Sequence, residues 1–290
     1  MLSHLDEIKV LPDGYHQIFA RARRVLEEDQ RVRAMWLGGS LARGSADAAS
    51  DLDVLVAVAD DGHESFTSSW RTWLADITPT VLAEELPFAK GSFYSVTPAF
   101  ERFDVVVEPV STLPTTLFRT RTVVFDRDGL TAGLPEADSA PGPSAAAVTA
   151  LVTEYFRVSS VETIVVRDDW LLAREYLHGV ASLIYRLFVE ANAPLPAMGV
   201  KQWSTKLTPP QREAMASLPT TAATIEELRA AHRAMAALFV TNAEALIGFL
   251  GGTWPEDLER AAAAHLADVL DLVDAYPRTG RVVVERQDGD

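Results

Sequence analysis

The segment that decides the fold of this chain is residues 36–58, which read WLGGSLARGSADAASDLDVLVAV. An apolar run ends at Leu37 in a Gly-Gly-Ser turn, ten residues pass, and Asp51 and Asp53 open a second apolar run. Because residues two apart in a strand point to the same face, the two carboxylates project together while Leu52 packs the other way. Two adjacent carboxylates repel strongly in a low dielectric unless a cation or proton neutralises them. The segment therefore predicts a site for a hard divalent cation such as Mg²⁺ at the start of a strand.

The Gly-Gly-Ser turn predicts an anion site facing that pair. Glycine lets the backbone approach a ligand closely and exposes N–H groups, and a turn that leads into a helix presents positive partial charge. Ser40 adds a hydroxyl to Gly39, and Arg43 is placed either to bind phosphate or to pair with an acid such as Asp47. A phosphate-binding turn opposite a metal-binding Asp-x-Asp suits metal-assisted attack on a nucleotide phosphate.

These motifs together resemble the signature of the DNA polymerase beta-type nucleotidyltransferase superfamily. The matching elements are Gly39-Ser40, the ten-residue gap with Arg43-Gly44, and Ser50-Asp51-Leu52-Asp53. The likeness spans residues 30–110 and is greatest to the small bacterial branch that includes the aminoglycoside and lincosamide nucleotidyltransferases. It implies a Mg²⁺-dependent enzyme that moves a nucleoside monophosphate from ATP or another NTP to a small-molecule hydroxyl and releases pyrophosphate. An aminoglycoside-like antibiotic as acceptor, and hence antibiotic resistance, follows from the same resemblance.

The resemblance also assigns roles to the acidic residues. Asp51 and Asp53 would hold the metal, and the family's third acidic residue, on a later strand, is matched by Asp104. Asp104 would complete the metal site or act as the general base that takes the proton of the acceptor hydroxyl. Glu108, on the same expected strand face, and Glu84, which precedes a loop expected near the site, are the other candidates for the base, so the sequence leaves this assignment open.

Five residues are candidates for binding the nucleotide. Gly39 and Ser40 would cradle the β and γ phosphates, with Arg43 beside them. The chain has only four lysines, and two of them, Lys201 and Lys206, flank a short segment that contains Trp203. A lysine is a mobile point charge that could reach a triphosphate. The alternative is an exposed loop whose tryptophan packs on the helical part of the chain.

Composition limits the class of protein. The chain has 290 residues, 48% of them apolar and 23% charged, which suits one large or two modest globular domains. It has no cysteine, which excludes disulfides and thiolate metal sites. The net charge of −15 argues against a nucleic-acid partner and favours a cationic small-molecule acceptor, although acidic chains are also common for solubility alone. With no leader and no membrane span evident, we expect a cytoplasmic protein with no membrane partner; the oligomeric state stays open.

The expected fold is α+β: a nucleotidyltransferase core with a small mixed sheet, followed by a C-terminal α-helical bundle. We place the core domain at 1–128, a Gly-, Pro- and Ala-rich linker at 129–144, a helical substrate-binding domain at 145–276 and a tail at 277–290. Hydrophobic periodicity predicts helices at 15–33, 64–77, 170–191, 209–218, 225–250 and 255–275, and strands at 32–37, 51–58, 78–84, 91–96, 102–110 and 123–125.

Two other kinds of function share these motifs. A nucleotidyltransferase of the toxin–antitoxin type would modify a protein side chain such as tyrosine, and its activity would depend on a co-encoded protein. A non-catalytic binding module that keeps the fold would need no metal. The acidic trio argues against such a module, because paired carboxylates beside a buried strand are costly without a cation.

Overall fold

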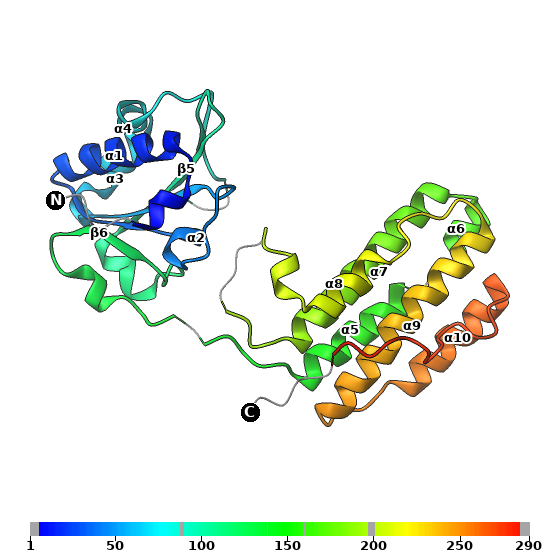
Figure 1. Ribbon diagram of the computed structural model, residues 1–290. Helices are drawn as coiled ribbons and strands as arrows, with labels where there is room; N and C mark the ends of the chain where they lie inside the picture. The colour runs from blue at the N-terminus through cyan, green and yellow to red at the C-terminus, as the bar shows by residue number, and fades with distance from the viewer. Residues whose placement is uncertain (1–5, 88–89, 138, 159–160, 197–200, 285–290) are drawn as a thin grey trace. The chain divides into compact units, whose positions relative to one another are not determined.

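The computed structural model describes residues 6–87, 90–137, 139–158, 161–196 and 201–284. The chain divides into two compact units, one formed mainly by Met1–Ser139 and the other by Ala140–Pro196 and Val200–Asp290 (Figure 1). The first unit is an α+β domain, and the second is α-helical, as the sequence predicts. None of the described helices is long and apolar enough to cross a membrane.

A six-stranded mixed sheet forms the centre of the first unit, in the order β3-β4-β5-β2-β1-β6. Only β2 and β5 pair in parallel, and every other pairing is antiparallel. Strands β1 and β2 are apolar and largely buried, which is typical of strands covered on both faces. The strand bounds are β1 (Val32–Leu37), β2 (Leu52–Val58), β3 (Leu82–Glu85), β4 (Ser92–Val96), β5 (Arg102–Pro109) and β6 (Thr122–Asp126).

The two faces of this sheet are covered unequally. Helices α1 (Asp13–Glu28), α3 (Asp60–Ser68) and α4 (Trp70–Ile77) pack on one face, over the larger core (Figure 1). The other face carries a much smaller core of Ala34, Trp36, Leu55, Ala57 and Leu113, covered by the short helices η2 (Val110–Thr115) and η3 (Leu130–Gly133). Strand alternation sends every second residue of β2 and β5 to this less covered face. The short elements η1 (Asp6–Val10) and α2 (Gly39–Ala42) complete the described part of the unit.

Two helices of the first unit differ from the sequence prediction for local reasons. The single helix expected at 64–77 is two helices, separated at Ser69, whose hydroxyl donates to the Phe66 carbonyl at 3.0 Å. Serine competes for backbone groups in this way and often ends helices. The first helix ends at Glu28 and not at residue 33, because the Asp29 carboxylate accepts the Arg31 amide at 2.9 Å and turns the chain toward β1.

The second unit is a helical bundle. Its longest helices, α7 (Trp170–Ala191) and α9 (Ile225–Phe249), pack against each other and against α5 (Ala145–Val158) (Figure 1). Asp169 caps α7 by accepting the Leu172 amide at 3.0 Å. Hydrophobic periodicity does not predict helix α5 as a separate element, since its alanine-rich start resembles the preceding linker. The remaining elements are α6 (Glu162–Arg167), η4 (Ser204–Lys206), α8 (Pro209–Ala216) and α10 (Glu256–Leu270).

A neutral histidine lies in the core of this bundle. His232 is 1% exposed, and its Nε2–H donates to the Ala275 carbonyl at 3.1 Å. A carbonyl can only accept, so Nδ1 of the neutral ring accepts the Tyr176 hydroxyl at 2.8 Å. Burial lowers the pKa of His232 from 6.5 to about 4, because a charged imidazolium would lose its hydration there.

We expect this histidine to make the helical unit less stable in acid. In the unfolded chain this histidine takes up a proton near pH 6.5, and in the folded chain only near pH 4. The free energy of unfolding is therefore highest above pH 6.5 and decreases as the pH falls toward 4. The loss should approach about 3 kcal/mol, measured by urea unfolding at several pH values. The slope should flatten in His232→Gln and persist in His178→Gln, which changes an exposed histidine; an unchanged slope in His232→Gln would refute the assignment.

Candidate active site

Two carboxylates meet on the less covered face of the sheet. The parallel pairing of β2 and β5 is regular over its whole length and sets Asp53 directly beside Asp104. Neighbouring strands are about 4.8 Å apart, so these two side chains project side by side. The sequence places both residues on strands, and the pairing register brings them together.

The Gly-Gly-Ser turn lies against this carboxylate pair. The Gly38 amide donates to the Asp53 carbonyl at 2.9 Å, which fixes the end of β1 to the start of β2. Gly39 has a φ of +55°, and a Cβ atom added to it would overlap Oδ2 of Asp53 and lie 2.7 Å from Cγ. Only glycine combines this backbone conformation with so close an approach. The turn and the Asp53 carboxylate are therefore built in contact with each other.

Two polar atoms of the turn fit a bound polar ligand. The Ser40 hydroxyl and Nε of Arg43 are both shielded from solvent, and neither has a hydrogen-bond partner among the residues that the structure describes. Buried polar atoms are normally paired, so an unpaired donor beside a glycine turn suits an oxyanion such as a phosphate. The acid Asp47, which the sequence offers as an alternative partner for Arg43, accepts instead from the Ala49 amide at 2.9 Å and from the Ser50 hydroxyl at 3.2 Å.

Asp51 has a basic neighbour. It lies one residue before β2, and its Oδ2 is 3.4 Å from Nη1 of Arg102, the first residue of β5. Over the described ranges of the chain, no three His, Asp or Glu side chains are gathered closely enough to hold a metal ion as they stand. That Asp51, Asp53 and Asp104 form a metal site thus stays a prediction.

The three candidates for the general base have different surroundings. Glu108 accepts from Arg121 and from the Thr116 hydroxyl, both at 2.6 Å, and it pairs with Ala57 at the other end of β2. Both oxygens of this carboxylate are therefore already occupied by other side chains. Glu84 lies on the exposed edge strand β3, in the same row across the sheet as Asp53 and Asp104.

The row reveals a residue that sequence reasoning missed. Tyr94 of β4 stands between Glu84 and Asp104, as the register partner of both. Direct register partners share a sheet face, so Glu84, Tyr94, Asp104 and Asp53 form one continuous row. No sequence motif marks Tyr94, because its place follows only from the strand order. Asp104 is the member of this row that lies next to Asp53, which favours it as the base.

Arg121 is a second residue without a sequence signal. Its side chain is 1% exposed, and its guanidinium lies 4.7 Å from the centre of the Trp36 ring. It pairs with Glu108 at 2.6 Å and receives further support from Thr116, at 2.8 Å. This buried ion pair connects β5 with the segment that precedes β6. It lies at the opposite end of the strands from Asp53.

The two lysines predicted to bind nucleotide belong to the second unit. Lys206 ends η4, and Lys201 precedes it in a turn. Trp203 between them stacks on Tyr185 of α7, with ring centroids 4.0 Å apart, as the packing alternative anticipates. A role of Lys201 or Lys206 in nucleotide binding stays a prediction.

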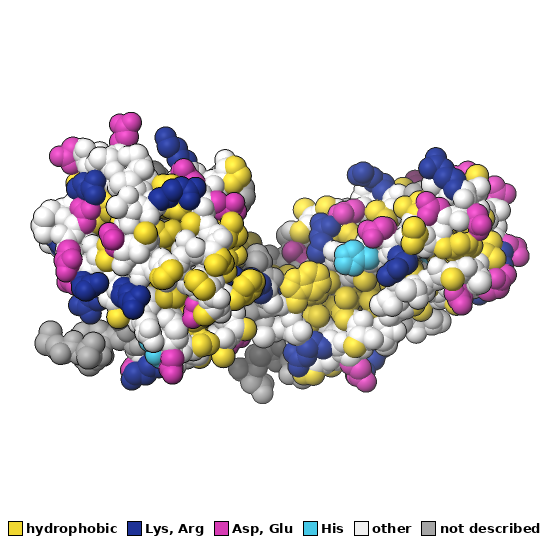
Figure 2. All heavy atoms as spheres, turned by 90° about the horizontal axis from the view of Figure 1, so that it is seen from above, with side chains coloured by type: hydrophobic (Ala, Val, Ile, Leu, Met, Phe, Trp, Pro, Cys, Tyr) yellow, Lys and Arg dark blue, Asp and Glu magenta, His cyan; other side chains and the backbone are white. Residues whose placement is uncertain are grey.

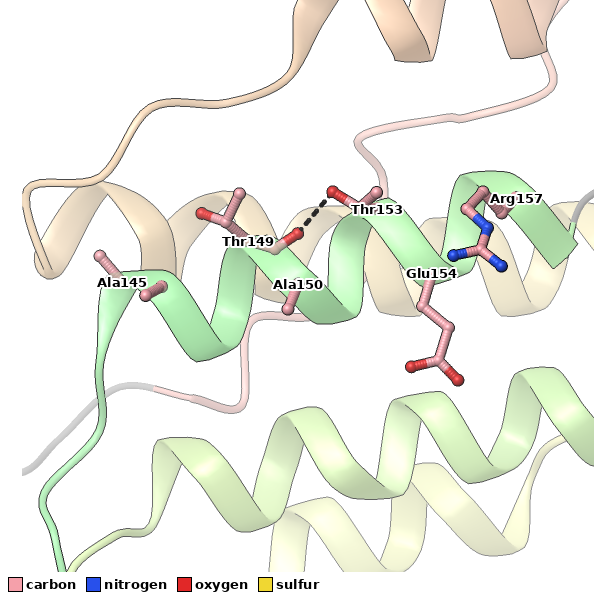
Figure 3. A pocket seen from close by; sticks show the side chains of 7 residues that line it. Ala145, Thr149, Ala150, Thr153, Glu154 and Arg157 are labelled. Atoms are coloured by element: carbon pink, nitrogen blue, oxygen red, sulfur yellow. Dashed lines mark hydrogen bonds between the residues drawn. The ribbon is translucent and has the colours of Figure 1, made fainter.

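The second unit also has an open groove along α5. It encloses about 830 Å³ and is lined by Ala145, Ala146, Thr149, Ala150, Thr153, Glu154 and Arg157 (Figure 3). The Thr153 hydroxyl donates to the Thr149 carbonyl at 2.9 Å, so this side chain is turned back onto its own helix. Glu154 is paired with Arg186 of α7 at 2.9 Å. None of the lining residues is a site residue predicted from the sequence.

On the face that Figure 2 shows, charges of both signs are mixed. Figure 2 shows acidic and basic side chains interspersed over the visible face of each unit. This face carries no basic stripe of the kind that binds nucleic acid.

Comparison with known proteins identifies the class of the first unit. Residues 20–90 match the family model of the nucleotidyltransferase domain, a range that holds the Gly-Gly-Ser turn, Asp51 and Asp53. The match confirms that the first unit carries a nucleotidyltransferase domain, as the sequence motifs predict. Asp104 lies beyond the matched range.

Solved structures and curated proteins add little detail. An aminoglycoside 6-adenyltransferase from Bacillus subtilis is 17% identical, with a TM-score of 0.40, over 88% of this chain and 96% of that chain. A nucleotidyltransferase-like protein from Exiguobacterium sibiricum is 13% identical, with a TM-score of 0.33, over 90% and 89% of the two chains. No curated protein matches the chain.

We expect Gly39→Ala to abolish binding of the nucleotide phosphates by pushing the Asp53 carboxylate out of place. The control is Gly129→Ala, since Gly129 has a similar φ of +70° but nothing within 4 Å of an added Cβ. Both changes carry a backbone cost of about 1–2 kcal/mol, so their thermal stabilities should fall similarly. Calorimetric binding of ATP with Mg²⁺ measures the difference; equal binding by both variants would contradict the predicted contact.

We expect Arg121→Met to destabilise the first unit by about 3 kcal/mol, because it leaves the Glu108 carboxylate buried without its cation. The double variant Glu108→Gln/Arg121→Met should recover most of this loss, since no charge is then left unpaired. Hydrogen exchange of the β5 and β6 amides measures the change in the unit itself. A double variant less stable than Arg121→Met would show that the pair is not the source of the loss.

Proposed function

We propose that this protein transfers a nucleoside monophosphate from a nucleoside triphosphate, with ATP as the first candidate, to a hydroxyl group of a small molecule. The carrying observation is the contact between the Gly39 turn and Asp53, with Asp104 in register beside it. The family match supports nucleotidyl transfer in general, and the acceptor and the metal belong to the proposal.

The residues of the first unit have separate roles in binding the phosphates, holding the metal and accepting the proton. Ser40 and the amides of the turn bind the β and γ phosphates, with Arg43 beside them. Asp53, Asp104 and Asp51 supply the carboxylate oxygens that Mg²⁺ prefers, and the bound ion would neutralise charge on the triphosphate. Asp104 takes the proton of the acceptor hydroxyl, whose oxygen bonds to the α phosphorus as the bond to the leaving pyrophosphate breaks.

The acceptor is proposed to be cationic. The row that runs from Asp104 through Tyr94 to Glu84 offers an aromatic ring flanked by carboxylates along the open sheet face. Such a row suits a compound that carries amines next to its reacting hydroxyl, because ring faces and carboxylates both attract ammonium groups. The motif likeness to aminoglycoside and lincosamide nucleotidyltransferases points to the same class, with antibiotic resistance as the role. A cytoplasmic location would supply the nucleotide.

The test is pyrophosphate release from ATP, GTP, CTP and UTP, each with Mg²⁺ and a panel of aminoglycosides and lincosamides. We expect one nucleotide and one acceptor class to support turnover. Asp104→Asn should lower kcat by about 100-fold or more, as expected for loss of a general base, and Asp53→Asn should abolish turnover. The control Asp128→Asn removes a carboxylate whose partner is Arg33, away from the site, and should leave turnover unchanged.

Two outcomes would overturn the proposal. Turnover that survives in Asp53→Asn under saturating nucleotide and Mg²⁺ would remove the assigned site. Absence of turnover with every small acceptor, together with labelling of a protein from the same cell by radioactive nucleotide, would favour the protein-modifying alternative.

A further inference from the structure

Arg102, the first residue of β5, lies beside the acidic residues of the site. In the parallel pairing of β2 and β5, Leu52 lies beside Phe103 and Asp53 beside Asp104. One residue before these pairs, Oδ2 of Asp51 lies 3.4 Å from Nη1 of Arg102. Arg102 therefore lies at the end of the two strands that carries Asp51, Asp53 and Asp104.

The side chain of Arg102 is anchored where it lies. Its Nη2 donates to the Ala49 carbonyl at 3.3 Å, in the loop that leads to Asp51, and its backbone amide donates to the Tyr15 hydroxyl at 3.1 Å. Its side chain is 27% exposed and that of Asp51 is 23% exposed. The pair is therefore partly shielded from water, where its charges act more strongly than on an open surface.

The contact of Arg102 with Asp51 is nevertheless a weak one. Its two charged atoms are 3.4 Å apart, whereas the buried pair of Arg121 and Glu108 closes to 2.6 Å with side chains that are 1% and 14% exposed. Partly exposed ion pairs contribute little, whereas a divalent cation binds carboxylate oxygen at about 2.0–2.1 Å with twice the charge. A divalent cation can therefore replace the arginine as the partner of Asp51.

We propose that Arg102 is a resident counterion of this site, which holds Asp51 while no metal is bound and which a divalent cation displaces. The inference deepens the proposed function, on which it rests for the identity of the cation as the Mg²⁺ of nucleotidyl transfer. Arg102 is a positioning residue: it lowers the repulsion among the three carboxylates and weakens binding of metal alone. Metal then binds well only when a triphosphate adds its own oxygens to the shell.

The test is binding of Mn²⁺ alone to the full chain without nucleotide, followed by the electron paramagnetic resonance signal of free Mn²⁺. We expect Arg102→Met, which keeps the length of the side chain but not its charge, to bind Mn²⁺ about fivefold more tightly than wild type. Arg102→Lys keeps the charge and should bind about as wild type does. If Arg102→Met does not fold, Arg102→Lys is compared with wild type instead. The inference then requires that Arg102→Lys bind Mn²⁺ no more than twofold more tightly than wild type.

A matched control separates the local contact from the change in net charge. Arg23 pairs with Glu27 at the same distance of 3.4 Å, on helix α1. Arg23→Met changes the net charge equally and should leave Mn²⁺ affinity unchanged. Equal or weaker Mn²⁺ binding by Arg102→Met, or an equal gain in Arg23→Met, would overturn the inference.

The same experiment keeps this inference distinct from the proposed function. If no nucleotide supports transfer, the proposed function fails, but tighter Mn²⁺ binding by Arg102→Met would still establish the counterion. If wild type binds no measurable Mn²⁺, Arg102→Met must gain binding, and its failure to do so overturns the counterion role whatever the transfer assay shows.

Discussion

The parallel pairing of β2 with β5 is the constraint on which the rest of the first unit depends. It is the only parallel pairing among the described strands, and it runs without irregularity from Leu52 beside Phe103 to Val58 beside Pro109. The apolar residues of both strands hold it by packing under α1, α3 and α4. Because side chains alternate, the burial of Val54 and Val56 on the helix side forces Asp53 and Asp104 to the other side. Core packing thus places the carboxylates.

Much of this arrangement could be predicted from the sequence because the signals are local. The strand at 32–37, the turn after it and the aspartates at the start of the next strand are contiguous, and the structure reproduces β1 at the predicted bounds. The break at Ser69 was missed because the hydrophobic stripe continues through it, and a serine bond to a carbonyl leaves no trace in periodicity. Helix α5 was missed as an individual element because alanine is compatible with both linker and helix.

The parts of the site that could not be predicted all depend on strand order. Tyr94 and Arg102 carry no motif, and they join Asp53 only because β4 and β5 lie where they do in the sheet. Glu108 shows the converse. Alternation puts it on the same face as Asp104, but the structure gives it a buried partner, Arg121, from a segment thirteen residues later. Sequence spacing assigns a face, and only the fold assigns neighbours.

The irregular pairings of β1 determine where this domain can tolerate inserted or deleted residues. The register of β1 shifts against β2 between Val32 and Ala34, and against β6 between Met35 and Trp36. A strand that already contains bulges can absorb one residue more or less at the same places. In β2 or β5 an added residue would exchange the two sheet faces, so that Asp53 would enter the apolar core and a leucine or valine would take its place. Insertions and deletions in related domains should therefore gather in β1 and its neighbouring loops, while β2 and β5 keep their lengths.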